Sequence, residues 1–319
     1  MGRTGRPITA FLPMTLYLLR RLLFALLVVV AVSFFSFVLV YLAGDPARSL
    51  AGVDSSEAHL AMIRTRYGLD QPLHRQYLHF VGNALQGNLG LSFRYNMDAM
   101  PLVLSKFGLT LQLALASLAL SLTVAVPLGI FAAIRRHTLL DGAATVFSLL
   151  GISTPGFWLG IILILVFADW LRLLPPSGLD EGWRSLVLPA IALSGYNIGL
   201  MTRLMRRSLL EELRKPYVTV AHAKGQRPLW VYLHHALRNA LIPTITVAGL
   251  QFGAMLGGSI VIETVFAWPG LGFLMIQAIR TNDLPVVRAA VLVVGLAFVI
   301  INLCVDLLYG VLDPRIRYR

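Results

Sequence analysis

The fold is decided by Tyr217–Pro243, YVTVAHAKGQRPLWVYLHHALRNALIP, a basic and partly polar stretch between two strongly apolar runs. Positive residues lie within it or just before it: Arg203, Arg206, Arg207, Arg214, Lys215, Lys224, Arg227 and Arg238. Loops that carry many Lys and Arg residues between membrane helices stay on the cytoplasmic side. The stretch therefore predicts a cytoplasmic loop, over about residues 206–240, in a protein that crosses a membrane several times.

Apolar runs long enough to cross a bilayer, which takes about 20 helical residues, recur along the chain. Apolar residues make up 57% of the sequence and charged residues 13%, which is too few charges for an ordinary soluble domain. We predict an all-α polytopic membrane protein. The six predicted transmembrane helices are about Leu22–Ala43, Leu109–Ile134, Leu139–Ala168, Leu186–Met205, Leu241–Ile262 and Val286–Tyr309.

Two of these runs allow more than one interpretation. The first and the third are each compatible with one long span or with a span plus a stretch on the lipid surface. The first run, which follows Arg20 and Arg21, is also too long for the apolar core of a signal peptide, and no small-residue cleavage site closes it. We predict that it is an uncleaved span.

The net charge of +12 would suggest a nucleic-acid partner if the charge formed one solvent-exposed patch. In the predicted topology, however, most Lys and Arg residues lie on the cytoplasmic side and most acidic residues lie outside. This distribution follows the positive-inside rule with both termini in the cytoplasm. We therefore predict the lipid bilayer as the environment and no nucleic-acid partner. The single cysteine, Cys304, permits no disulfide within one chain.

About 60 residues follow the first span on the outer side. Gly44-Asp45-Pro46 ends that span, and Asp54-x-x-Glu57 is typical of a capping box that opens a short helix running to Tyr67. A second amphipathic helix is predicted after Pro72. Both are too short to cross the membrane. They either cap the outer ends of the spans or take part in receiving a soluble partner.

Glycines spaced four residues apart point to close helix packing. Gly249, Gly253 and Gly257 form one stripe along the fifth predicted span. Small residues at this spacing let two helix backbones approach closely within a membrane. The stripe is expected to face either another helix of this chain or a second membrane subunit.

The sequence contains no enzyme constellation. It has no Gly-x4-Gly-Lys-Ser/Thr loop for a nucleotide, no His-Glu-x-x-His and no paired cysteines, so we predict neither catalysis nor a metal site. Carriers driven by protons or sodium ions are expected to hold several acids within the membrane. Here only Asp306 lies clearly inside a span, with Asn302 one turn before it. The two residues either line a polar path, or Asp306 pairs with Arg315 or Arg317.

A chain with no energy source of its own must be driven through contact with another protein. The cytoplasmic loop alone offers enough surface for that contact. Its Val218–Lys224 segment favours a stiff helix, and Gly225 permits a sharp turn at its end.

Motifs along essentially the whole chain resemble the permease subunits of bacterial ABC importers for dipeptides, oligopeptides and nickel. The loop carries Ala-x-Ala-Lys-Gly over 221–225 and His-Ala-Leu-Arg-Asn-Ala-Leu-x-Pro over 235–243. Further matches are Glu-Thr-Val-Phe-x-Trp-Pro-Gly-Leu-Gly from Glu263, Asp-x-Pro-Val-Val from Asp283 and the closing Asp-Leu-Leu-Tyr-Gly-x-x-Asp-Pro-Arg-Ile-Arg from Asp306. The general importer motif begins Glu-Ala-Ala, whereas this chain has Thr219-Val220-Ala221 in those places.

This resemblance implies a division of the chain into residues 1–104, the first helix with its outer segment, and residues 105–319, a five-helix permease core. It also implies that the loop helix docks into a cleft of an ATPase. The residues expected to make that coupling are Thr219, Ala221, His222, Ala223, Lys224, Gly225, Leu237, Arg238 and Asn239.

The expected partners are a homologous second permease, one or two ABC ATPase subunits and an extracytoplasmic solute-binding protein. This chain would bind no cofactor, while ATP and Mg²⁺ would sit on the ATPases. The expected location is the bacterial inner membrane.

The implied function is to form half of a translocation pathway for di- or oligopeptides. Import of nickel or glutathione by the same architecture is the alternative within the family. From other classes, a stand-alone channel or secondary carrier and a membrane-anchored assembly protein stay open.

Overall fold

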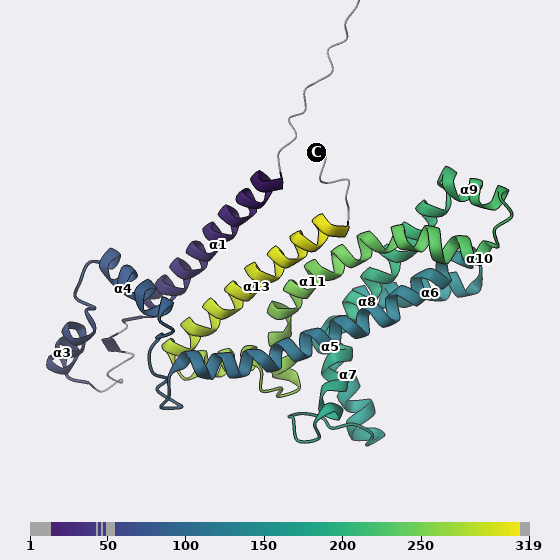
Figure 1. Cartoon of the computed structure of the whole chain (residues 1–319). Coiled ribbons are helices and arrows are strands. Elements are labelled where there is room, and N and C mark those ends of the chain that lie inside the picture. Colours follow the sequence, from purple (N-terminus) through teal and green to yellow (C-terminus); the bar gives the residue numbers. More distant parts are fainter. Residues whose placement is uncertain (1–13, 43, 46, 49–54, 313–319) are drawn as a thin grey trace, which may run out of the picture.

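The computed structural model describes residues 14–42, 44–45, 47–48 and 55–312, and within them the chain is helical apart from loops and one isolated bridge between Leu91 and Asp98 (Figure 1). Long helices form the body of the molecule, and short helices lie at its two ends. The elements are α1 (Met14–Leu42), α3 (Glu57–Tyr67), α4 (Leu73–Leu85), α5 (Ala99–Ile134), α6 (Leu139–Ser153), α7 (Gly156–Leu163), η1 (Ile164–Trp170), α8 (Trp183–Leu213), α9 (Pro216–Ala223), α10 (Pro228–Trp230), η2 (Val231–Ala236), α11 (Leu237–Val265), α12 (Leu271–Arg280) and α13 (Leu284–Leu312).

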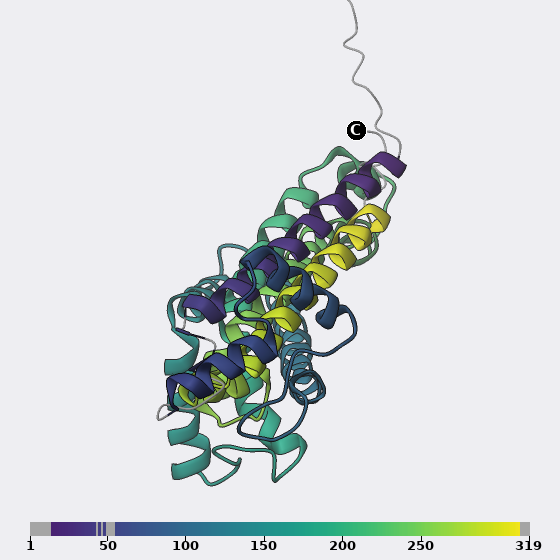
Figure 2. The ribbon, with the colours of Figure 1, turned by 90° about the vertical axis from the view of Figure 1, so that its left-hand side faces the viewer.

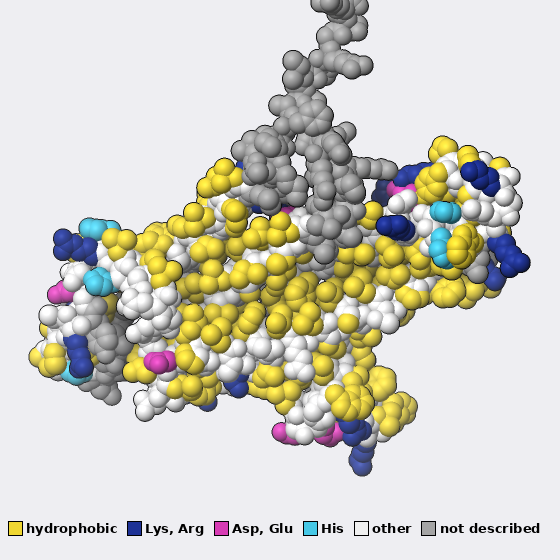
Figure 3. Space-filling view, in the orientation of Figure 1, with side chains coloured by type: hydrophobic (Ala, Val, Ile, Leu, Met, Phe, Trp, Pro, Cys, Tyr) yellow, Lys and Arg dark blue, Asp and Glu magenta, His cyan; other side chains and the backbone are white. Residues whose placement is uncertain are grey.

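Five helices of the described chain are long and apolar enough to span a membrane: α1, α5, α8, α11 with the preceding η2, and α13. A sixth span is complete only if α6 and the α7–η1 helix, which meet at 104°, are taken together. The six spans expected from hydropathy are thus confirmed. Figure 3 shows the apolar side chains that cover the middle of the molecule, as a bilayer requires.

The bend in the third span has a local cause. Pro155 follows Thr154, and a proline forces the residue before it out of the helical region. Thr154 is extended accordingly, with φ −86° and ψ 120°, and the helix resumes only after Pro155. This run is therefore not one straight helix but two helices that meet at a sharp corner.

Helix α8 is the centre of the core. It packs against α5, α6, α7 and α11, whereas α1 lies at the edge against α13 and α4 (Figures 1 and 2). Close contact between α6 and α8 depends on Gly199, because a Cβ there would lie 2.4 Å from the carbonyl oxygen of Ser148. A methyl group at Gly129 of α5 would likewise lie 2.8 Å from the carbonyl oxygen of Thr202.

The two short helices α3 and α4 follow α1 and lie together at one end of the molecule (Figure 1). The side chain of Ser56 caps α3 by accepting a hydrogen bond from the backbone N–H of His59 at 3.3 Å, and Gly68 closes the helix in the left-handed conformation. The predicted cap, Asp54, lies outside the described residues, and the helix begins at Glu57 itself. Phe80 of α4 packs on α1.

Residues between α11 and α13 fold back into the core around a buried carboxylate. Glu263 has no exposed surface and accepts hydrogen bonds from Thr110 at 2.6 Å and from the backbone N–H of Phe273 at 2.9 Å. Trp268 is also buried, and its indole donates to the carbonyl oxygen of Leu109 at 3.1 Å. Trp268 lies just after the end of α11, and packing against α5 and α8 buries it.

Candidate coupling site

Helix α9 stands apart from the spans at the end of the molecule opposite α3 and α4 (Figure 1). Pro216 occupies its first turn, where the missing N–H costs nothing, after the extended Lys215. The helix ends at Ala223, and Gly225, two residues further on, has a φ of +76° in the left-handed region that favours glycine. The N–H groups of Gly225 and Gln226 then close the turn onto the carbonyl oxygens of His222 and Ala221.

One face of α9 is anchored to the rest of the chain. Val218 and Ala221 are buried against Val231 of η2, with Leu213 of α8 packed beside them. The Tyr217 hydroxyl donates to Glu212 at 2.7 Å and lies 3.4 Å from the side-chain nitrogen of Asn239, which donates to it. Burial, and next the hydrogen bond to Glu212, raise the pKa of Tyr217 above its ordinary value. These contacts tie α9 to both α8 and the start of α11.

The opposite face of α9 is open. Thr219, His222, Ala223, Lys224 and Gly225 are all exposed, and Figure 3 shows basic and histidine side chains gathered at this end of the molecule. Ala221 differs from them because it is only 8% exposed and points into the chain. Among the residues expected to make the coupling, Ala221 therefore supports α9 from within.

The segment after α9 continues the same surface. Trp230 stacks on His234 with ring centroids 3.4 Å apart, and the His235 ring lies 3.2 Å from the side-chain oxygen of Gln226. Of the predicted residues here, Arg238 and Asn239 are exposed, and Leu237 packs partly against a buried cluster of α5, α8 and α11. This cluster holds the base of the loop on the spans.

The predicted residues of α11 and α13 lie away from α9. A Cβ at Gly249 would lie 2.6 Å from Val305, and one at Gly253 would lie 3.3 Å from Phe298, so these two glycines face α13. Gly257 faces open space, with nothing within 4 Å of such a Cβ. The stripe therefore meets a helix of this chain along part of its length only.

Asp306 makes an ion pair with Arg21 of α1 at 2.5 Å. The alternative partners expected for it, Arg315 and Arg317, lie outside the described residues. The side-chain nitrogen of Asn302 donates to the carbonyl oxygen of Phe298 in its own helix at 3.0 Å. A helix periodicity does not reveal a partner on a distant span, which is why the pairing of Asp306 with α1 was missed.

A groove between α7, α8 and α11 was also missed. It has a volume of about 340 Å³ and is lined mainly by small and apolar residues, together with Tyr196, Asn197 and Gln251. The side-chain oxygen of Asn197 is buried and has no hydrogen-bond partner among the described residues. The sequence did contain a signal for this groove, because side-chain amides such as those of Asn197 and Gln251 are unusual inside apolar spans and often mark functional sites.

Comparison with known proteins bears on the whole chain. The family model described as "Binding-protein-dependent transport system inner membrane component" matches residues 125–318, and a model for the N-terminal part of such membrane components matches residues 14–114. The chain is 41% identical over 304 residues to the glutathione transport system permease protein GsiC of Escherichia coli O6:H1 (strain CFT073), covering 95% of this chain and 99% of that protein. Its identity to GsiC of Salmonella choleraesuis (strain SC-B67) is 41% over 305 residues, with the same coverage.

Among solved structures, the MetNI methionine ABC transporter in inward-facing conformations shares the fold. Its TM-score is 0.55 at 17% identity, over 67% of this chain and 97% of the MetNI chain. At this identity the likeness concerns the fold alone.

Proposed function

We infer the function of this chain from the family to which it belongs, the inner-membrane components of binding-protein-dependent transport systems. It is a multi-pass permease subunit of a bacterial ABC importer, a transport component rather than a catalytic enzyme. We propose that it forms half of the translocation pathway and is driven by a separate ATPase through α9.

The observation that carries the coupling proposal is the two-sided character of α9. Its outer face is exposed, while Val218 and Ala221 on its inner face are packed against η2 and α8. A push on the exposed face is therefore transmitted to two spans at once, because packed helices move as rigid bodies. Closure of the ATPases would move α9, shift the third to fifth spans and open the pathway to the outer side.

This proposal fixes the orientation of the molecule and its partners. Helix α9, the start of α1 and the end of α13 would lie on the cytoplasmic side, and α3 and α4 outside. ATP and Mg²⁺ would sit on the ATPases. A homologous second permease would complete the pathway, and a solute-binding protein would deliver the solute from outside.

The residues of the groove between α7, α8 and α11 are better candidates for lining the pathway than the two polar residues of α13. The groove is lined by Gly258, where a Cβ would meet nothing within 4 Å among the described residues, and by Asn197, whose amide oxygen has no hydrogen-bond partner among them. Asn302 and Asp306 stay a prediction as pathway residues.

The solute we propose is a short peptide, with glutathione to be tested first. Glutathione is itself a small peptide, and the relatives that match this chain nearly end to end are named as glutathione permeases. Dipeptides, oligopeptides and nickel are the alternatives. Selectivity in such systems is expected to rest mostly with the binding protein.

Cross-linking tests the coupling directly. In a Cys304→Ser background, Lys224→Cys is expected to cross-link to a co-expressed ATPase, with a yield that changes when ATP is added. Arg94→Cys, exposed at the opposite end of the molecule, is the matched control and should form no such product. Absence of an ATPase adduct at Lys224 and at Ala223→Cys would contradict the proposal.

Reconstitution tests the solute and the class of protein together. The permease is placed in liposomes with its co-expressed partners, and ATP hydrolysis is measured with binding protein loaded with glutathione, a dipeptide or nickel. The glutathione-loaded form is expected to stimulate hydrolysis most. Solute flux through this chain alone, without ATP, would instead identify a channel or secondary carrier.

A further inference from the structure

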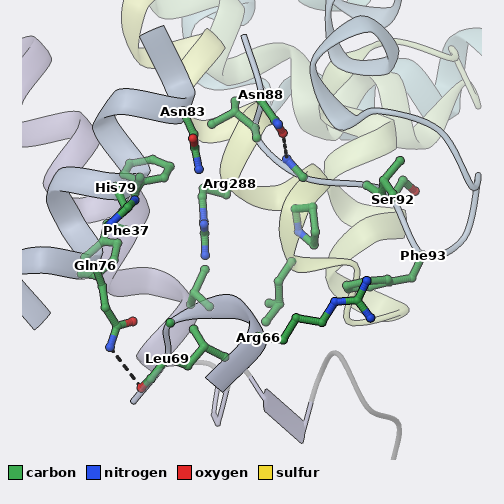
Figure 4. Close-up of a pocket in the computed structure, with 18 of the residues that line it drawn as sticks. Phe37, Arg66, Leu69, Gln76, His79, Asn83, Asn88, Ser92, Phe93 and Arg288 are labelled. Carbon is green, nitrogen blue, oxygen red and sulfur yellow. Dashed lines mark hydrogen bonds between the residues drawn. The ribbon is translucent and has the colours of Figure 1, made fainter. Parts of the chain in front are cut away.

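A second cavity lies at the end of the molecule away from α9. It has a volume of about 960 Å³ and is enclosed by α1, α3, α4, the loop before α5 and the start of α13 (Figure 4). Its size is that of a site for a small organic ligand. The proposed pathway, which includes the groove between α7, α8 and α11, does not pass through this cavity.

Arg288 of α13 runs through this cavity beside Asn83 and His79 of α4 (Figure 4). Its guanidinium carbon lies 5.1 Å from the centre of the Phe80 ring, and its buried Nε has no hydrogen-bond partner in the part of the chain that the structure describes. No ion pair with Arg288 forms among the described residues. Asp98 also lines the cavity, but it does not pair with Arg288.

The other polar groups around Arg288 are largely satisfied within the chain. The Gln76 side chain accepts from the Tyr41 hydroxyl and donates to the carbonyl oxygens of Leu69 and Gln71. Asn88 accepts from the backbone N–H of Gly90 at 3.2 Å. An arginine that is mostly withdrawn from water, without an anion beside it, is costly for the fold. Arg66 also lines the cavity without an ion pair, but its side chain is exposed to water. Arg288 is thus the largely buried cation of this cavity that lacks a counter-charge among the described residues.

The cavity lies level with the ends of two membrane spans. Phe37, Val40 and Tyr41, in the last turns of the span Leu19–Leu42, line it, as does Arg288 near the start of the span Leu284–Leu307. The hydroxyl of Ser36 donates to the carbonyl oxygen of Arg288 at 3.1 Å, which holds the two span ends together. Span ends lie where the phosphates of a bilayer lie.

We propose that this cavity binds an oxyanion of the phosphate type, supplied by the headgroup of an anionic phospholipid. The planar guanidinium of an arginine presents paired N–H donors that match two phosphate oxygens. Phe34, Phe35, Leu39 and Leu42 on the same part of α1 are exposed and apolar, so acyl chains would find protein surface next to the headgroup.

The test measures lipid binding by the full chain, purified with its co-expressed partners in neutral detergent and stripped of lipid. Phosphatidylglycerol, phosphatidylcholine and inorganic phosphate are added separately. Bound lipid is counted by native mass spectrometry and thermal unfolding is followed in parallel. Phosphatidylglycerol is expected to bind most tightly and to raise the unfolding temperature most. Since neither ATP nor a transported solute is added, failure of the coupling proposal would leave this result unchanged.

Variants assign the effect to Arg288. Arg288→Gln should weaken phosphatidylglycerol binding about ten-fold or more, since it removes a charged hydrogen-bond donor. Arg288→Lys, which keeps the charge but not the paired donors, should lie between it and the wild type. Arg75→Gln, an exposed arginine on α4, is the matched control and should bind as the wild type does.

Each outcome decides the proposal. An equal effect of inorganic phosphate, with no preference for phosphatidylglycerol, would support an oxyanion site but overturn the lipid as its source. If the wild type shows no preference for phosphatidylglycerol over phosphatidylcholine and no effect of phosphate, the proposal is wrong whether or not the variants fold. Unchanged binding by Arg288→Gln would likewise overturn it.

Discussion

The guanidinium of Arg206 makes a bidentate ion pair with the carboxylate of Asp141. Its Nε and Nη2 lie 2.7 and 2.8 Å from the two carboxylate oxygens. Asp141 also accepts a hydrogen bond from the backbone N–H of His137 at 3.0 Å. The pair joins the first turn of α6 to α8, on the side from which α8 continues toward α9. A two-pronged pair fixes direction as well as distance, so it sets how α6 follows a movement of α8.

The pair gives a prediction about stability and coupling. Arg206→Lys keeps the charge but loses the fork, and Asp141→Asn loses the charge. In a double-mutant cycle of unfolding in detergent, the pair should show a coupling of about 1–2 kcal/mol, because the Asp141 side chain is only 10% exposed. Both single variants should lower the ATP hydrolysis stimulated by binding protein several-fold.

The control for this cycle is the pair of Arg207 with Glu211. Both side chains are well exposed, at 80% and 61%, and exposed pairs of this spacing contribute about 0.3–0.5 kcal/mol. Arg207→Lys should therefore leave stability and hydrolysis near the wild-type values. Equal effects at the two pairs would rule out a special role for Arg206.

Substitutions at the two alanines of α9 distinguish residues that hold the loop in place from residues that contact the ATPase. Ala221 is buried beside Val231, so Ala221→Asp places an unpaired carboxylate in an apolar cluster and should loosen the loop. Ala223 is exposed, so Ala223→Asp should disturb only the surface offered to the ATPase. Both variants are expected to abolish uptake at normal membrane expression. Only Ala221→Asp should make the loop more sensitive to protease in the absence of the ATPase.

Gly225→Pro is expected to give the same loss of uptake, because proline cannot adopt the φ of +76° found there. Wild-type uptake by either Gly225→Pro or Ala221→Asp would count decisively against coupling through α9.

Hydropathy and turn residues predicted the helices well, but not the contacts among them. The start of α4 after Pro72 and the turn at Gly225 that follows α9 were predicted, since proline and glycine act locally. The inward direction of Ala221 did not follow, because α9 is short and apolar on more than one side. Nor did the pairing of Asp306 with Arg21, which joins residues at opposite ends of the chain and depends on how α1 packs.

Glu263 provides a prediction about the segment between α11 and α13. Its buried carboxylate accepts from Thr110, Ser259 and the backbone of Phe273. Glu263→Gln keeps the shape but replaces one acceptor with a donor, so at least one of these bonds must be lost. We expect unfolding to become easier by about 1–3 kcal/mol, measured in detergent. Glu181→Gln, at an exposed pair with Arg184, should change stability little.

The last prediction concerns Gly253 and Gly257, which lie one turn apart on α11. A side chain at Gly253 would press on Phe298 of α13, whereas a Cβ at Gly257 would meet nothing within 4 Å among the residues that the structure describes. Gly253→Leu should therefore destabilise the isolated subunit by about 1–3 kcal/mol through overpacking, and Gly257→Leu should not. If the open part of the stripe faces the second permease, Gly257→Leu should instead reduce recovery of that permease in pull-down experiments.

Gly108→Leu serves as the matched control for this comparison, because a Cβ there also meets nothing within 4 Å. Gly108 lies on α5, so its replacement should affect neither stability nor assembly if the second permease docks on α11. A normal yield of the two-permease complex with Gly257→Leu would show that the open glycines face lipid or the pathway. The close helix contact made by this glycine stripe would then be confined to the α11–α13 interface within this chain.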